Sequence, residues 1–261
     1  MQATRRGAIG TLAAVGSVFG TVAHAQAPRK TFVLVHGSSA GGWCCRRVAD
    51  LLEARGHKVY APTLTGLGER SHLVSGQITL DTHITDVANV IKWEDLDQFV
   101  LVGHSYGGWI ISGVAESYEK RITSIVFLDA FMPEDGQRVL DTNSARSRGE
   151  IEEALRRAEV SRPAPSASVW KVNPKDQPWV DEKFTAQPIG VAFTPIRLTG
   201  ARDRVPKKNL CPRQRLRQSQ FRARLRQGPS RSHLAHLRAR VRSRGDDRLP
   251  ERTAEILLEV A

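Results

Sequence analysis

Residues 101–108 read LVGHSYGG, a stretch that places one serine between two glycines directly after an apolar run. Gly103, Ser105 and Gly107 match the pattern G-x-S-x-G, in which a serine stands on a sharp turn from a strand into a helix. Such a turn leaves no room for side chains beside the serine, and it raises the hydroxyl above the sheet. The pattern predicts that Ser105 is a nucleophile for acyl transfer, the alternative being a surface serine.

Acyl transfer also needs N–H donors for the negative oxygen that forms on the attacked carbonyl carbon. One donor in such sites is the backbone N–H of the residue after the nucleophile, here Tyr106. Residues 35–43, VHGSSAGGW, read as a strand end followed by a glycine-rich loop. We expect the N–H of Ser38 in this loop to be the second donor, the alternative being a plain turn.

Elements that could position these groups alternate along the chain. Short apolar runs predict strands at 31–36, 57–62, 98–103, 122–131 and 194–200. Helical periodicity predicts helices at 42–56, 78–94, 106–121, 148–160 and 250–261. Nearly continuous apolar strands separated by helices are typical of a parallel sheet covered on both faces. The predicted class is therefore α/β, with a doubly wound, mostly parallel sheet.

Two segments stand apart from this alternation. Residues 132–190 are rich in proline, serine and charge, and they predict an inserted helical cap over the sheet. Residues 1–25 begin with Arg5 and Arg6, continue with small apolar residues and end on Ala-His-Ala, as a twin-arginine-like export signal does. The expected mature domain is 26–261, in the periplasm or secreted, with no membrane contact after cleavage.

The stretches 32–73, 101–116 and 125–137 resemble the α/β-hydrolase family of plant methyl esterases and hydroxynitrile lyases with their bacterial esterase relatives. The resemblance covers residues 31–206 in order and returns at 250–261. It implies an α/β-hydrolase fold with a helical cap and a serine hydrolase for small-molecule esters. It also implies that neither cofactor nor metal is needed, and no metal-ligand spacing of Cys and His is visible among the three cysteines and eight histidines.

The same resemblance points to the carboxylate that would orient the base. Residues 196–206, IRLTGARDRVP, resemble the family's next-to-last strand and the loop that carries the acid, which assigns Asp203 to that role. Asp129, which also follows a predicted strand, is the alternative. In the family that position supports the cap, so Asp203 is preferred.

The base of the serine, acid and histidine triad has no clear candidate in the sequence. The order in this fold is serine, acid, histidine, and among the histidines only His233 and His236 follow Asp203. Family members carry the base after a glycine shortly before the last helix. Neither histidine follows a glycine. Codons permitted for residues 242–247, read one nucleotide later, can encode Gly-His-Glu, and that histidine falls on Ser243, the expected slot.

Residues 209–248 depart from the family pattern and hold twelve arginines and two aspartates, which accounts for most of the formal net charge of +12. A basic arm for nucleic acid is one interpretation, but aromatic residues for base stacking are scarce in it. We favour two compensating frameshifts, because GC-rich codons read out of frame give such arginine-rich sequence.

The sequence thus predicts a serine carboxylesterase that takes a small ester and binds no nucleic acid. Two alternatives stay open, a catalytically impaired homologue that lacks the triad histidine and a hydroxynitrile lyase. A homodimer is also left open.

Overall fold

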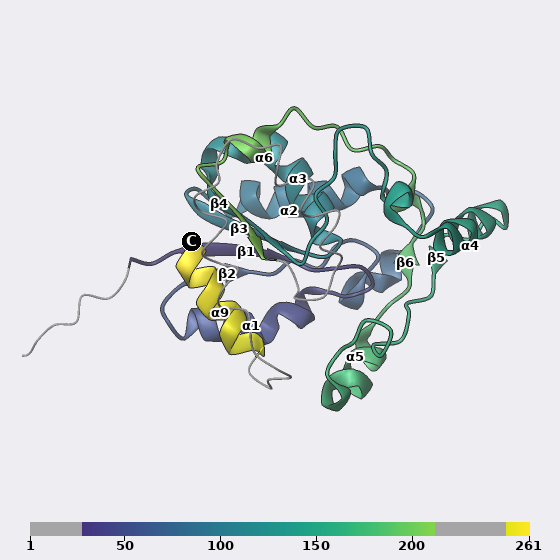
Figure 1. The fold of residues 1–261 in the computed structure, drawn as a ribbon, viewed down its shortest axis with the longest axis horizontal. Helices are drawn as coiled ribbons and strands as arrows, with labels where there is room; N and C mark the ends of the chain where they lie inside the picture. Colours follow the sequence, from purple (N-terminus) through teal and green to yellow (C-terminus); the bar gives the residue numbers. More distant parts are fainter. Residues whose placement is uncertain (1–27, 212–248) are drawn as a thin grey trace, which may run out of the picture.

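The computed structural model describes residues 28–211 and 249–261 (Figure 1). The expected export signal, His233, His236 and Ser243 lie outside the described residues, as does all of the arginine-rich segment after Cys211 up to Arg248. The predictions made for those residues therefore stay predictions.

One five-stranded sheet forms the centre of the fold, with the strand order β2-β1-β3-β4-β7 and parallel pairing throughout. The strands are β1 (Thr31–Val35), β2 (Lys58–Tyr60), β3 (Phe99–His104), β4 (Ile122–Leu128) and β7 (Lys207–Cys211). All carboxyl ends therefore meet at one edge of the sheet. The predicted α/β class with a doubly wound parallel sheet is confirmed.

Helices cover both faces of this sheet (Figure 1). On one face lie α1 (Arg46–Glu53) and α9 (Leu249–Val260), and on the other lie α2 (Leu80–Trp93), α3 (Gly107–Tyr118) and α6 (Ala201–Arg204). Short 3-10 helices connect them at η1 (Gly42–Cys45), η2 (Gly68–Leu73), η3 (Glu119–Arg121), η4 (Val139–Thr142), η5 (Pro174–Asp176) and η6 (Gly190–Ala192). None of the described helices is long and apolar enough to cross a membrane.

Alternation along the strands explains why helices are needed on both sides. In β1, Phe32 and Leu34 face α1 and α9, whereas Val33 and Val35 face α2 and α3, and all four are buried. The α9 face is also tied by polar contacts, because the hydroxyl of Ser124 donates to the carbonyl oxygen of Val260 at 2.8 Å.

Residues 132–190 leave the sheet and form small elements beside it, at the right of Figure 1. These are α4 (Ala145–Arg156), β5 (Ser161–Arg162), α5 (Gln177–Lys183) and β6 (Gln187–Pro188), with β5 and β6 antiparallel. Helix α5 contacts the main body through the rings of Trp43 and Trp179, whose centroids are 5.0 Å apart. The guanidinium of Arg47 adds an ion pair to Asp176 at 3.0 Å.

The strand expected at 194–200 is wrong, because the chain there is irregular and the edge strand β7 begins at Lys207. Pro195 supplies no backbone donor, and the backbone N–H groups of Leu198 and Thr199 donate to carboxylates of Asp135 and Glu116 instead of to a strand. Residues 209–211, the start of the arginine-rich segment, complete β7 because Cys211 and Leu210 pack into the apolar layers on the two faces.

Candidate functional site

Ser105 stands where β3 ends and α3 begins, with a φ angle of +51° that a serine rarely adopts. The motif glycines allow this turn. A Cβ on Gly103 would lie 2.7 Å from the carbonyl oxygen of Gly107, and a Cβ on Gly107 would lie 2.6 Å from that of Val35. Both distances are too short for any side chain, so G-x-S-x-G is a packing requirement at this turn.

The loop after β1 passes directly over the serine. A Cβ on Gly37 would lie 3.2 Å from the Cβ of Ser105, so the glycine lets the loop backbone approach the hydroxyl. The backbone N–H groups of Ser38 and Tyr106 donate to no acceptor within the part of the chain that the structure describes. An oxyanion site needs two such unpaired donors, so both residues stay candidates for that role.

His36, which the sequence analysis did not single out, fixes the peptide that carries the first of these amides. The N–H of Leu64 donates to Nε2 of His36 at 3.1 Å, so Nδ1 bears the proton and donates to the carbonyl oxygen of Gly37 at 2.7 Å. Because that carbonyl and the Ser38 N–H belong to one planar peptide, the amide must point the other way. Burial lowers the pKa of His36 to about 4, so the ring is neutral at neutral pH.

Tyr106 is held by a second buried histidine. Its hydroxyl lies 3.0 Å from Nδ1 of His83, and Nε2 of His83 lies 2.9 Å from the carbonyl oxygen of Thr65. Since a carbonyl can only accept, Nε2 donates and Nδ1 accepts from the tyrosine. Asp86 completes the chain by accepting from the N–H of Thr65 at 2.6 Å. Burial raises the pKa of Tyr106 and lowers that of His83, which keeps both groups neutral.

Asp203 is not brought together with Ser105, and its expected place after a strand is wrong. It lies in α6 and precedes β7, whose first residue Lys207 pairs with Ser124 at the amino end of β4. The side chain of Asp203 is 51% exposed and forms an ion pair with Lys208. A strand at 194–200 would put Asp203 at the carboxyl edge of the sheet, but the strand is β7, so Asp203 lies at the amino edge.

Asp129, the alternative carboxylate, lies at the same edge as the serine. His104 pairs with Leu128 in the register of β3 and β4, so Ser105 and Asp129 are the next residues beyond two neighbouring strands. The N–H of Phe131 donates to the carbonyl oxygen of Ser105 at 3.1 Å, which ties this loop to the elbow. Asp129 has a φ of +46°, a second strained backbone position at this edge.

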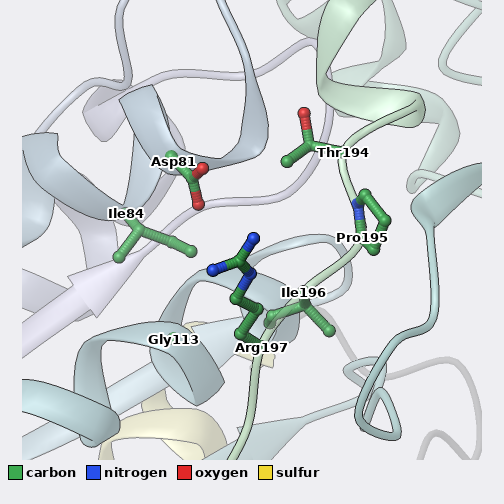
Figure 2. A pocket seen from close by; sticks show the side chains of 7 residues that line it. All are labelled: Asp81, Ile84, Gly113, Thr194, Pro195, Ile196 and Arg197. Atoms are coloured by element: carbon green, nitrogen blue, oxygen red, sulfur yellow. The ribbon is translucent and has the colours of Figure 1, made fainter.

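A cavity of about 430 Å³ lies elsewhere, between α2, α3 and the irregular segment 194–197 (Figure 2). Its lining carries two opposite charges, and Figure 2 shows the guanidinium of Arg197 extended toward the side of the cavity that Asp81 and Ile84 form. None of the residues assigned to the acyl-transfer site lines it, so the chemistry and this cavity are separate.

Comparison with known proteins places these observations in a family. The model of the "Alpha/beta hydrolase family" matches residues 32–249, which includes the elbow, the loop after β1 and Asp129. A solved structure, an extracellular α/β-hydrolase from a Paenibacillus species, aligns with a TM-score of 0.69 at 24% identity and covers 89% of this chain and 99% of that one. This likeness shows the fold.

Sequence relatives add an activity class. A carbendazim hydrolyzing esterase of Nocardioides sp. (strain SG-4G) is 38% identical over 187 residues, which is 68% of this chain and 77% of that protein. Salicylic acid-binding protein 2 of Nicotiana tabacum is 39% identical over 106 residues, which is 40% of this chain and 41% of that protein. The chain thus matches less than half the length of this plant relative. It belongs to the alpha/beta hydrolase family and is a hydrolase of that family's esterase group.

Proposed function

We propose that this protein is a carboxylesterase that cleaves small esters with Ser105 as the nucleophile. The observation that carries the proposal is the strained serine at the β3–α3 turn, with the glycine of the opposite loop against its Cβ. Strain of this kind costs about 1–3 kcal/mol and persists where it aims a reacting group. The esterase relatives support the same assignment.

In the proposed reaction the hydroxyl oxygen of Ser105 attacks the ester carbonyl carbon, and a base accepts the hydroxyl proton. The carbonyl oxygen becomes an oxyanion and receives hydrogen bonds from the N–H groups of Ser38 and Tyr106. Collapse of the adduct expels the alcohol and leaves an acyl group on the serine, which water then removes. Residues 132–190 are proposed to cover the substrate as a cap.

Asp129 replaces Asp203 as the proposed carboxylate that orients the base. The register of β3 and β4 supports this choice, because it brings the residues after both strands to one edge. Within residues 28–211 and 249–261, His36 and His83 are already committed to buried hydrogen bonds. In this fold the base follows the serine and the acid along the chain, and only His233 and His236 follow Asp129. We therefore propose that the base comes from the segment between Cys211 and Leu249.

The test is covalent labelling of the serine. An alkyl fluorophosphonate should add one phosphonyl group to the chain, peptide mapping should find it on Ser105, and Ser105→Ala should abolish it. Hydrolysis of a short-chain aryl ester should vanish in the same variant. Labelling at another residue, or ester hydrolysis that survives Ser105→Ala, would contradict the proposal.

A catalytically impaired homologue is the second candidate, favoured by the arginine-rich sequence at 209–248 where the base is expected. If the frame is shifted there, restoring it should raise aryl-ester turnover by several orders of magnitude, because loss of a triad base costs on the order of 10⁶ in turnover. Equal turnover of the two forms would mean that His233 or His236 serves as base.

Export to the periplasm or the medium is also part of the proposal, carried by Arg5 and Arg6 and by the Ala-His-Ala sequence before Gln26. The mature protein from its native host should begin at Gln26. Recovery of secreted protein that still begins at Met1 would contradict this expectation.

A further inference from the structure

The cap reaches the loop of the first oxyanion donor through one buried side chain. The N–H of Ser39 donates to Oε1 of Gln187 at 2.7 Å, and both residues are almost fully buried, at 1% and 3% exposure. Next to this bond, the N–H of Thr185 donates to the carbonyl oxygen of Ser39 at 3.0 Å. Residues 185–187 therefore hold the backbone on both sides of Ser39.

Ser39 needs such support because its backbone is strained. Its φ angle is +59°, in the left-handed region where a side chain costs roughly 1–2 kcal/mol. Without an acceptor for its N–H, Ser39 would relax toward an extended conformation, and the peptide between Ser38 and Ser39 would turn with it. That peptide directly follows the one that carries the Ser38 N–H, so the direction of the oxyanion donor depends on it.

Gln187 itself is firmly placed. It belongs to β6, where its backbone pairs with Arg162 of β5, and the N–H of the nearby Ile189 donates to the carbonyl oxygen of Val160 at 3.0 Å. The side chain thus connects a small sheet outside the main body to the loop over Ser105.

The side-chain amide of Gln187 leaves one buried donor unpaired, which lowers stability. Its Nε2 is buried and has no hydrogen-bond acceptor in the described part of the chain. An unpaired buried donor costs about 1–3 kcal/mol, which an apolar side chain of the same size would avoid. The favourable interaction of Gln187 is therefore the hydrogen bond that Oε1 accepts from the N–H of Ser39.

We propose that Gln187 is a positioning residue of the oxyanion site, acting through Ser39 on the N–H of Ser38. This inference rests on the proposed function, because it assumes that an oxyanion forms at Ser105. It also makes the cap a part of the catalytic machinery. When residues 185–187 move away from the loop, the peptide of the first donor keeps only its support from His36.

The experiment compares two glutamines of the cap. Gln187→Met keeps the size of the side chain and removes the acceptor. Gln177→Met is the matched control, because Gln177 lies in α5 and donates from Nε2 to the carbonyl oxygen of Val172 at 2.9 Å, away from the loop. Gln187→Glu keeps an acceptor for Ser39. Two quantities are measured, the rate of Ser105 phosphonylation by an alkyl fluorophosphonate and the hydrogen exchange of the Ser39 amide.

Gln187→Met should slow maximal phosphonylation about tenfold, since loss of a whole oxyanion donor costs about 10²–10³. The reagent concentration for half-maximal rate should not change. The Ser39 amide should exchange faster in Gln187→Met and stay protected in Gln187→Glu, and Gln177→Met should leave both quantities as they are. A rate for Gln187→Met equal to that of the unaltered chain, or an equal loss in Gln177→Met, would overturn the inference.

Two further outcomes are also decisive. If Gln187→Met does not fold, a folded Gln187→Glu protein whose Ser39 amide has lost protection overturns the inference, and retained protection supports it. If the unaltered chain takes up no phosphonate, the proposed function fails. The amide exchange of the Gln187 variants then decides the positioning role alone.

Discussion

The two edges of the central sheet differ in almost every physical respect. At the carboxyl edge, Gly107 approaches the backbone of Val35 too closely for any side chain, and Gly37 packs tightly against the side chain of Ser105. Ser105 and Asp129 at this edge have strained backbones. At the amino edge, Asp203 is half exposed and ion-paired. The carboxyl edge is thus constrained in its backbone and buried, whereas the amino edge carries solvated charges.

This difference separates acids that could do chemistry from acids that only balance charge. Arg204 donates from Nε to Glu119 at 2.8 Å at the amino edge, in the same exposed setting as the pair of Asp203 and Lys208. Exposed ion pairs of this kind contribute little, about 0–1 kcal/mol each. A carboxylate in α/β folds is therefore better judged by the strand end it follows than by its order in the chain.

The largest expected effect concerns the elbow. Ser105→Ala should abolish hydrolysis of a short-chain aryl ester, whereas Ser38→Ala should cost far less, because only the backbone N–H of Ser38 is used. Steady-state assays on both variants, with circular dichroism to verify folding, check this. Equal losses in the two folded variants would show that the Ser38 hydroxyl, and not its amide, matters.

Backbone constraint predicts the next effect. Gly107→Ala should lower the free energy of unfolding by roughly 2 kcal/mol or more, because its Cβ would lie 2.6 Å from the carbonyl oxygen of Val35. Gly149→Ala in α4 is the control, since a Cβ there meets nothing within 4 Å and alanine favours a helix by roughly 0.5–1 kcal/mol. Urea denaturation measures the free energy of unfolding of both variants. Equal values would show that the turn at Gly107 relaxes to accept a side chain.

Asp129 and Asp203 test the comparison of the two sheet edges directly. Asp129→Asn should slow phosphonylation of Ser105 by roughly tenfold or more, because an acid that holds the base in its tautomer is lost. Asp203→Asn should leave that rate unchanged and alter the free energy of unfolding by less than about 1 kcal/mol, since its ion pair is exposed. If only Asp203→Asn slowed phosphonylation, Asp203 at the amino edge, and not Asp129, would be the acid that orients the base.

The smallest expected effect is a pH dependence of stability at the carboxyl edge. Burial lowers the pKa of His36 to about 4 in the folded protein, below that of an unfolded histidine, so the unfolded state binds the proton more tightly. Stability is thus full above the unfolded pKa and falls as the pH drops toward 4, by about 1 kcal/mol between pH 7 and 5.5. His83, whose pKa is also lowered by burial, adds in the same direction. Urea denaturation at the two pH values measures the sum, and a flat profile would mean that His36 is hydrated.

Sequence patterns predicted the fold from β1 to β4 closely, because each strand there is an apolar run and each helix has one apolar face. Strand β7 was not predicted because its sequence, KKNLC, begins with two lysines and only its last residue is buried. The run at 194–200 is more apolar, yet two of its backbone N–H groups donate to Asp135 and Glu116, and no local pattern reveals such long-range acceptors.

At the site, G-x-S-x-G predicted the turn because its glycines are a local steric requirement. The supporting residues could not be found in this way. Gln187 is 148 residues from Ser39 and meets it only after the cap has formed. His36 adjoins the loop, but the proton on its Nδ1 is fixed by the N–H of Leu64, which is 28 residues away in the sequence. The one available signal for His36 is its position directly before Gly37 at the end of a buried strand.

The position of α9 in the chain affects folding during translation. It covers the face of the sheet that carries Phe32 and Leu34, and Val260 accepts the hydroxyl of Ser124 from the sheet interior. Until residues 249–261 have been synthesised, this apolar face is covered only in part, by α1. A nascent chain of this kind is prone to aggregate or to be held by chaperones. The sheet can therefore reach its final packing only after translation has passed α9.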